Sequence, residues 1–393
     1  MLPRECYLPA AGLDAAQWCA THYLDNQGRR EQILRISSAS DTYLDWERRH
    51  SGDNGRTWSD PEPIPDVVQR LPGGGLVTYP GGSDVDPASG GCYSRRMRRL
   101  WPGAEPFTFE WKNHDHPFTD HCFVVEQHPG DDPVECHLRY EEGPAWDPAD
   151  PFAPAFAAAN GAYFGNSFAF DGHGGVYLPL VCQVANAGAG LHKSGLTLMR
   201  RDAGGDWLPS NRVHVRADQS SRGLLEPDAA VLGDGRILVI ARGSNTETTA
   251  GRKWVTLSTD SGQTLEPVRE LTFDDGTSFY SPSSIHRLLR SSRNGRLYWL
   301  ANICDEPPDG NGPRHPLWLA EIDEERAAVR RDSLVLVDHR EPGDGEGVQL
   351  SNFTFLEDQE TGRFEIYLTR IGEDTEHFWK GAVYRYLFEP PAG

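Results

Sequence analysis

The sequence of 393 residues carries a formal net charge of −20, and 24% of its residues are charged. Because phosphate binding needs a basic face, we expect no nucleic-acid partner. No apolar run approaches the roughly 20 residues that span a bilayer, so we expect no membrane partner either. The 41 glycines, 29 prolines and 11 tryptophans favour a globular protein of many short strands joined by tight turns.

The seven cysteines are odd in number and widely spread, and no two of them form a Cys-x-x-Cys pair. This pattern predicts reduced thiols rather than a disulfide framework or a zinc site. The first six residues also lack the basic segment and apolar core of a signal peptide. We therefore expect a cytoplasmic protein with no bound metal and no cofactor, with secretion as the alternative if a leader has been trimmed. The oligomeric state is left open.

One pattern recurs along the chain: a β-rich run, a turn that contains glycine, and a second β-rich run. Seven such hairpins are predicted, at residues 18–36, 67–79, 121–140, 162–181, 227–242, 281–302 and 350–370. Seven units leave about 56 residues each, within reach of propeller repeats. The sequence therefore predicts an all-β fold: one β-propeller domain over residues 1–393 with four-stranded blades. Seven blades are favoured, and six are the alternative.

A turn motif is expected late in one of these units. Residues 51–58 read Ser-x-Asp-x-Gly-x-Thr-Trp, in which the serine and aspartate can accept hydrogen bonds from backbone amides of their own turn. Gly55 supplies a positive φ, and Trp58 is expected to pack against apolar neighbours. A degenerate copy spans residues 258–265, where Leu265 replaces the aromatic residue. Both copies fall where the outer hairpin of a blade is expected.

The motif at residues 51–58 resembles the Asp boxes of the sialidase superfamily, also called BNR repeats, whose members are β-propellers. The family places an acidic residue before an Asp-Gly hairpin that ends in a substrate-binding arginine. Glu226, Asp234-Gly235 and Arg242 reproduce that order. The resemblance implies that Arg242 pairs with a substrate carboxylate and that Glu226 orients or activates a nucleophile. It also implies that Arg314 is a second substrate arginine; the alternatives are a bracing ion pair and a solvated loop residue.

The chain departs from the family at two places. Arg35 and Ile36 are followed by serine instead of the proline of an Arg-Ile-Pro motif, and they lie close to the Asp box. Asn352 stands where the family's tyrosine nucleophile is expected, so it is expected to bind substrate rather than react. Tyr280 from the neighbouring unit is a replacement nucleophile, with a packed aromatic side chain as the alternative.

Other polar residues extend the candidate site. His116 lies in a histidine-rich loop, residues 113–121, and is a candidate catalytic base. Asp84 is a candidate acid or base in an early loop. Tyr163 and Asn166 open the fourth predicted hairpin and are expected to line a central pocket, with ordinary strand packing as the alternative.

These residues predict an exo-acting glycoside hydrolase that releases a terminal sugar from an acidic oligosaccharide or polysaccharide containing uronate or sialate. A polysaccharide lyase that cleaves a rhamnosyl-glucuronate type of linkage with a histidine base is a second hypothesis. A non-catalytic glycan-binding propeller is the third. The sequence does not identify the sugar or the linkage.

Overall fold

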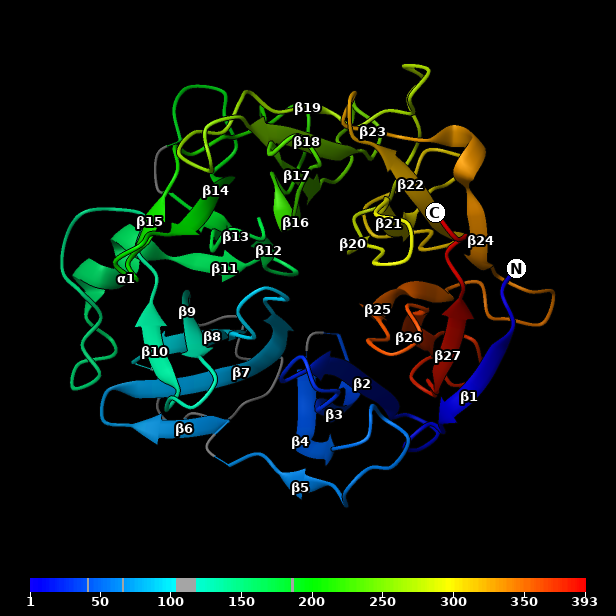
Figure 1. The fold of residues 1–393 in the computed structure, drawn as a ribbon, viewed down its shortest axis with the longest axis horizontal. Helices are drawn as coiled ribbons and strands as arrows, with labels where there is room; N and C mark the ends of the chain where they lie inside the picture. The colour runs from blue at the N-terminus through cyan, green and yellow to red at the C-terminus, as the bar shows by residue number, and fades with distance from the viewer. Residues whose placement is uncertain (41, 66, 104–117, 185–186) are drawn as a thin grey trace.

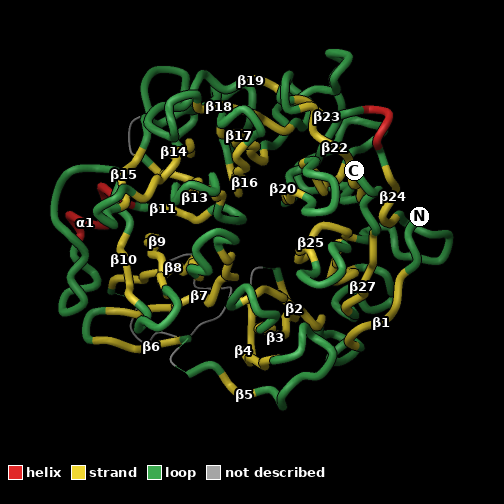
Figure 2. Tube along the Cα trace, in the orientation of Figure 1, coloured by secondary structure: helices red, strands yellow, loops and turns green. Residues whose placement is uncertain are grey.

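The computed structural model describes residues 1–393 except 41, 66, 104–117 and 185–186. Six antiparallel sheets stand around a central axis, so the predicted all-β propeller is confirmed (Figure 1). The six-bladed alternative is correct, and the preference for seven blades is wrong. Figure 2 shows strands around the centre, with the helical segments α1 (Pro154–Asn160) and η2 (Arg331–Ser333) at the periphery.

We number the blades in chain order. Blade 1 contains β2 (Ala16–Tyr23), β3 (Arg30–Ala39), β4 (Thr42–Ser51) and β5 (Glu62–Pro63); blade 2 contains β6 (Val68–Leu71), β7 (Gly74–Val85), β8 (Cys92–Pro102), β9 (Thr119–Gln127) and β10 (Val134–His137). Blade 3 contains β11 (Ala162–Phe164), β12 (Ala169–Phe170), β13 (Val176–Gln183), β14 (Ser194–Arg201) and β15 (Trp207–Pro209); blade 4 contains β16 (Leu225–Val231), β17 (Ile237–Arg242), β18 (Lys253–Ser258) and β19 (Arg269–Glu270). Blade 5 contains β20 (Arg287–Arg290), β21 (Leu297–Asn302), β22 (Leu317–Asp323), β23 (Ala328–Val329) and β24 (Val335–Asp338); blade 6 contains β25 (Gln349–Glu357), β26 (Phe364–Ile371), β27 (Val383–Phe388) and β1 (Arg4–Leu8).

Blade 2 explains the wrong blade count. The predicted hairpins at residues 67–79 and 121–140 belong to the same sheet, in the order β10-β9-β8-β7-β6. Strand β8 joins them, because it pairs with β7 on one side and with β9 on the other. The sequence reveals each hairpin through its local turn, but it carries no signal for strands that pair across the intervening residues.

The core lies between neighbouring blades. All six residues of β17 are buried, and they form a nearly continuous apolar run, as expected of strands covered on both faces. Successive side chains point to opposite faces of a strand. Leu238 and Ile240 therefore pack into a cluster with blade 5, whereas Ile237 and Val239 pack into one with blade 3.

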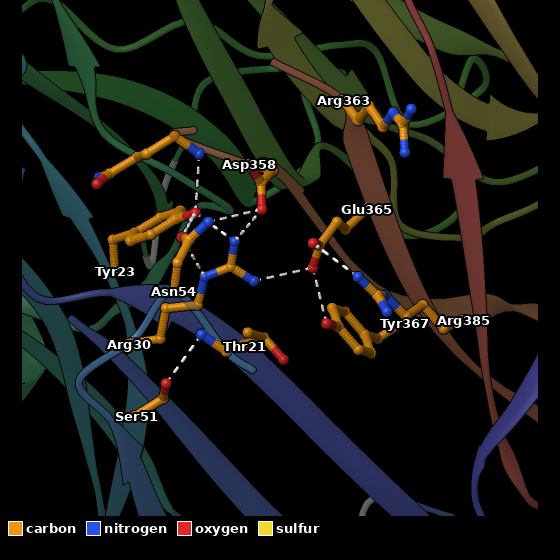
Figure 3. Close-up of polar contacts among 12 residues, drawn as sticks. Thr21, Tyr23, Arg30, Ser51, Asn54, Asp358, Arg363, Glu365, Tyr367 and Arg385 are labelled. Atoms are coloured by element: carbon orange, nitrogen blue, oxygen red, sulfur yellow. Dashed lines mark hydrogen bonds and ion pairs between the residues drawn. The ribbon is translucent and has the colours of Figure 1, made fainter. Parts of the chain in front are cut away.

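The first and last blades are joined by strand pairing and by a buried ionic network. Strand β1 pairs with β27, so the N-terminal segment completes blade 6 (Figure 1). Arg30 of β3 is 1% exposed, and its guanidinium binds Asp358 at 2.7 Å, Glu365 at 3.0 Å and Asn54 at 3.1 Å (Figure 3). Because Asp358 and Glu365 belong to blade 6, this arginine closes the ring.

The turn expected at residues 51–58 forms between β4 and β5. Asp53 accepts hydrogen bonds from the backbone amide of Thr57 at 2.9 Å and from its hydroxyl at 2.6 Å. Gly55 has a φ of 83°, as its role requires. Trp58 differs from the expectation, because it is only partly buried and lies under the guanidinium of Arg49.

The degenerate copy at residues 258–265 forms the same hydrogen bonds between β18 and β19. Asp260 accepts from the amide of Thr264 at 2.8 Å and from its hydroxyl at 2.6 Å. Leu265, at the position equivalent to Trp58, is 4% exposed and packs into the core. The leucine therefore anchors its turn more deeply than the tryptophan does.

Candidate functional site

A cavity of about 1560 Å³ lies on the propeller axis. It is lined by the innermost strands of all six blades, which are β2, β7, β11 with β12, β16, β20 and β25. Seven of the predicted site residues line this cavity. They are Asp84, Tyr163, Asn166, Glu226, Arg242, Arg314 and Asn352.

Glu226 and Arg242 form an ion pair in the wall of this cavity. Glu226 is near the start of β16 and Arg242 ends β17, so the hairpin brings them together. Their side chains lie 2.5 Å apart. The strand pairing shifts register beside Glu226, whose φ is 41°. Such backbone conformations are costly and concentrate at functional sites.

The ion pair keeps Glu226 charged. Burial alone would raise the pKa of this carboxyl, but the charge and hydrogen bond of Arg242, with the charges of Arg314 and Lys253, hold its pKa below the usual value. Glu226 is therefore ionised at neutral pH and can accept a proton, but it cannot donate one.

Arg314 comes from the connection between β21 and β22 in blade 5. Its guanidinium donates to the side-chain oxygen of Gln349 at 2.8 Å and to the backbone oxygen of Ser283 at 3.1 Å. The hydroxyl of Ser283 accepts a hydrogen bond from Nε of Arg242 at 2.8 Å. The two arginines predicted to bind substrate thus meet at one serine.

Tyr163, Asn166 and Asn352 have different surroundings. Burial and the nearby charge of Glu226 raise the pKa of Tyr163 well above its usual value, so its phenol stays protonated. The amide of Asn166 donates to the backbone oxygens of Glu226 at 3.1 Å and His286 at 2.8 Å. Asn166 therefore supports the backbone under Glu226, whereas Asn352 lines the cavity from β25.

Asp84 has contacts that brace two blades. It forms an ion pair with Arg95 at 2.6 Å and accepts a hydrogen bond from the backbone amide of Phe168, in blade 3, at 3.1 Å. Asp228 of blade 4 likewise accepts a hydrogen bond from the backbone amide of Leu288, in blade 5, at 2.6 Å. Each aspartate joins the inner strand of its own blade to that of the following blade.

Two further predictions fall outside this cavity or outside the described structure. Tyr280 does not line the cavity; its ring lies under the guanidinium of Arg252 at 4.6 Å, and its backbone bridges to Cys304. His116 lies in residues 104–117, which are outside the described residues. Within the described residues, no group of three or more histidine, cysteine or acidic side chains is placed to hold a metal. In the same part of the chain, no helix has the length and apolar character to cross a membrane.

Arg35 is a cavity residue that the sequence reasoning passed over. Its guanidinium lies over the rings of Tyr43 at 4.0 Å, Trp46 at 5.1 Å and Trp18 at 5.5 Å. Among the described residues, it forms no ion pair with a carboxylate. Its sequence signal is the Arg35-Ile36 pair, which departs from the Arg-Ile-Pro motif and lies close to the Asp box.

A second missed feature is a row of side chains across blade 1. Glu31 accepts hydrogen bonds from Nε2 of His22 at 3.0 Å and from Nε2 of His50 at 3.2 Å. The three residues are direct neighbours across β2, β3 and β4, and His22 lines the cavity. The Nδ1 atom of His22 is buried without a hydrogen-bond partner in the described structure.

This row predicts a pH dependence of stability. Burial alone would raise the pKa of Glu31, but the hydrogen bond and charge of His22, with the charges of Arg96 and His50, lower it from 4.5 to about 2. A lowered pKa in the folded state stabilises the protein above pH 4.5, and that stabilisation is lost as the pH falls toward 2. We expect Glu31→Gln to reduce the free energy of unfolding by about 3 kcal/mol near neutral pH, and by less as the pH falls below 4.5.

Urea unfolding of both proteins from pH 7 to pH 3 measures this difference. The exposed pair of Arg216 and Asp218 offers a control, because Arg216→Gln removes a surface interaction that contributes little. A difference between Glu31→Gln and the unchanged protein that stays constant over this range would contradict the prediction.

Solved structures with the same architecture include sialidases. A protein of unknown function from Dyadobacter fermentans matches with a TM-score of 0.61 and 14% identity, over 98% of this chain and 97% of its own. The NanB sialidase of Streptococcus pneumoniae matches with a TM-score of 0.58 and 13% identity, over 98% of this chain and 70% of its own. The Trypanosoma rangeli sialidase matches with a TM-score of 0.56 and 12% identity, over 98% of this chain and 59% of its own.

No protein-family model matches the sequence, and no curated protein matches it. At 12–14% identity, the likeness to solved structures establishes the fold alone. The resemblance to sialidases inferred from the sequence therefore holds for the six-bladed fold.

Proposed function

We propose that the protein is a glycoside hydrolase that releases a terminal acidic sugar from an oligosaccharide or polysaccharide. Arg242 and Arg314 hold the sugar carboxylate, because guanidinium groups bind carboxylates through paired hydrogen bonds. One observation carries the proposal: guanidinium groups from two blades meet at Ser283 beside the ionised Glu226, in the wall of the axial cavity. The fold shared with sialidases supports the reaction class.

In this proposal Tyr163 is the nucleophile and Glu226 is its base. Both line the cavity, and the pKa of Tyr163 responds to the charge of Glu226. The phenol oxygen attacks the anomeric carbon while its proton moves to Glu226, and the glycosidic bond breaks with its electron pair on the departing oxygen. An acid protonates that oxygen, and water then cleaves the glycosyl–tyrosine bond. His116 and Asp84 stay predictions for the acid, and Asn352 stays one for binding the sugar.

An activity screen against sialylated and uronate-containing oligosaccharides tests this function. Sugar release and ultraviolet absorbance are followed in the same wells, because an unsaturated uronate absorbs and a hydrolysis product does not. We expect release without absorbance, and loss of release in Tyr163→Phe. Release that persists in Tyr163→Phe would remove the tyrosine from the mechanism, and wells without release would contradict the hydrolase.

The row of His22, Glu31 and His50 favours a second candidate, a polysaccharide lyase. His22 lines the cavity, and its Nε2 donates a hydrogen bond to the ionised Glu31, which orients the imidazole as a base. In an elimination, His22 would remove the proton at C5 of a uronate while the bond from C4 to the leaving oxygen breaks. Absorbance that grows in the screen and disappears in His22→Gln would support the lyase. A cavity that binds glycans and shows neither signal would support the binding propeller.

A further inference from the structure

Ser283 makes three hydrogen bonds that join separate parts of the site. Its hydroxyl accepts Nε–H of Arg242 at 2.8 Å, and its backbone oxygen accepts Nη2–H of Arg314 at 3.1 Å. Its own amide donates to the backbone oxygen of Gly310 at 2.9 Å. Ser283 is fully buried, so these contacts form in the absence of competing water.

A buried lysine binds the backbone on both sides of Ser283. Lys253 of β18 is fully buried, and its Nζ donates to the backbone oxygens of Pro282 at 3.2 Å and Ser284 at 2.5 Å. Lys253 is also the direct neighbour of Arg242 across β17 and β18. The lysine therefore fixes the carbonyl groups on both sides of Ser283.

The two arginines come from different blades. Arg242 ends a strand of blade 4, whereas Arg314 lies in a connection of blade 5. Their side chains are long and flexible, and ordering them only when the ligand arrives would weaken binding. Contact with one buried residue orders both guanidinium groups in advance and fixes the distance between them.

We propose that Ser283 is the positioning residue that sets the spacing of Arg242 and Arg314 for a single ligand carboxylate. This inference rests on the proposed carboxylate-binding function of the cavity. Ser283 acts through the two arginines and does not itself touch the sugar. Its hydroxyl is therefore required for selecting an acidic sugar over the neutral sugar of the same shape.

Crystal structures of Ser283→Ala and Ser283→Thr test the positioning directly. The measured quantity is the separation of the Cζ atoms of Arg242 and Arg314. We expect it to change, or one guanidinium to lose order, in Ser283→Ala and to be retained in Ser283→Thr, which keeps a hydroxyl. Ser281→Ala is the matched control, because Ser281 is equally buried but its hydroxyl donates to the backbone oxygen of Asn302 instead of accepting from an arginine. An unchanged separation in Ser283→Ala would overturn the proposal.

Calorimetric titration then tests the consequence for binding, with D-glucuronic acid, N-acetylneuraminic acid and D-glucose as probes. We expect Ser283→Ala to weaken binding of an acidic sugar about tenfold, while Ser281→Ala and Ser283→Thr bind as the unchanged protein does. Equal affinity in Ser283→Ala would refute the role of the serine. If the unchanged protein binds neither acid, the proposed function fails, and the crystal structures still decide whether Ser283 positions the arginines.

Discussion

Replacement of Arg242 by methionine is expected to weaken binding of a carboxylated sugar roughly 30-fold to 4000-fold, because truncating one partner of a buried charged hydrogen-bond pair costs about 2–5 kcal/mol. The same change removes the ion-pair partner of Glu226, which is 18% exposed, and leaves only the nearby charges of Arg314 and Lys253. The loss of this partner is expected to lower the free energy of unfolding by roughly 3–5 kcal/mol. Calorimetric titration with D-glucuronic acid and urea unfolding measure the two effects.

The double variant Glu226→Gln with Arg242→Met separates binding from stability. It removes both charges, so we expect most of the lost stability to return while binding of the acid stays weak. Arg236→Met is the control, since Arg236 directly precedes the same strand, pairs with Asp234 and does not line the cavity. Normal affinity for the acid in the double variant would show that Arg242 only braces blade 4.

Replacement of Arg30 by methionine is expected to be the most destabilising single change in the ring closure. Arg30 is the cation between Asp358 and Glu365, and all three side chains are largely buried (Figure 3). Removing it leaves the carboxylate of Asp358 without this cation and Glu365 with Arg385 alone, and we expect the free energy of unfolding to fall by roughly 3–5 kcal/mol. The midpoint of urea unfolding measures the change.

Arg363→Met provides the matched control for this prediction. Arg363 lies in blade 6, directly before β26, is half-exposed, and approaches Glu389 only at 3.6 Å. Exposed pairs of this kind contribute about 1 kcal/mol or less. If Arg30→Met and Arg363→Met unfold at the same urea concentration, the network around Arg30 is not what joins blade 1 to blade 6.

The sequence predicts the fold best where the structure depends on local turns. Asp234 and Gly235 mark the hairpin of β16 and β17, and Gly235 has the positive φ that such a turn requires. The same hairpin also brings Glu226 against Arg242, although the pairing shifts register beside Glu226. An ion pair within one hairpin is therefore predictable from residue order alone.

Contacts between blades are not predictable in this way. Arg35 reaches the cavity because the packing of β2, β3 and β4 places it there, and nothing in its sequence neighbourhood specifies that position. Ser283 is a neutral residue outside the repeating pattern, so its link between two arginines emerges only when blades 4 and 5 are placed together. Within blade 2, the pairing of β8 with β7 and β9 likewise lies beyond any local turn, so two hairpins of one blade count as two units in the sequence.

The affinity of the protein for matched acidic and neutral sugars tests the central claim most directly. Calorimetric titration with D-glucuronic acid and D-glucose compares two sugars that differ only in the group expected to meet Arg242 and Arg314. N-acetylneuraminic acid and its methyl ester form a second pair. We expect at least one acid to bind about tenfold or more tightly than its neutral partner, with the preference falling at high salt. Equal affinities within both pairs, or no binding of either acid, would contradict a carboxylate site on the propeller axis.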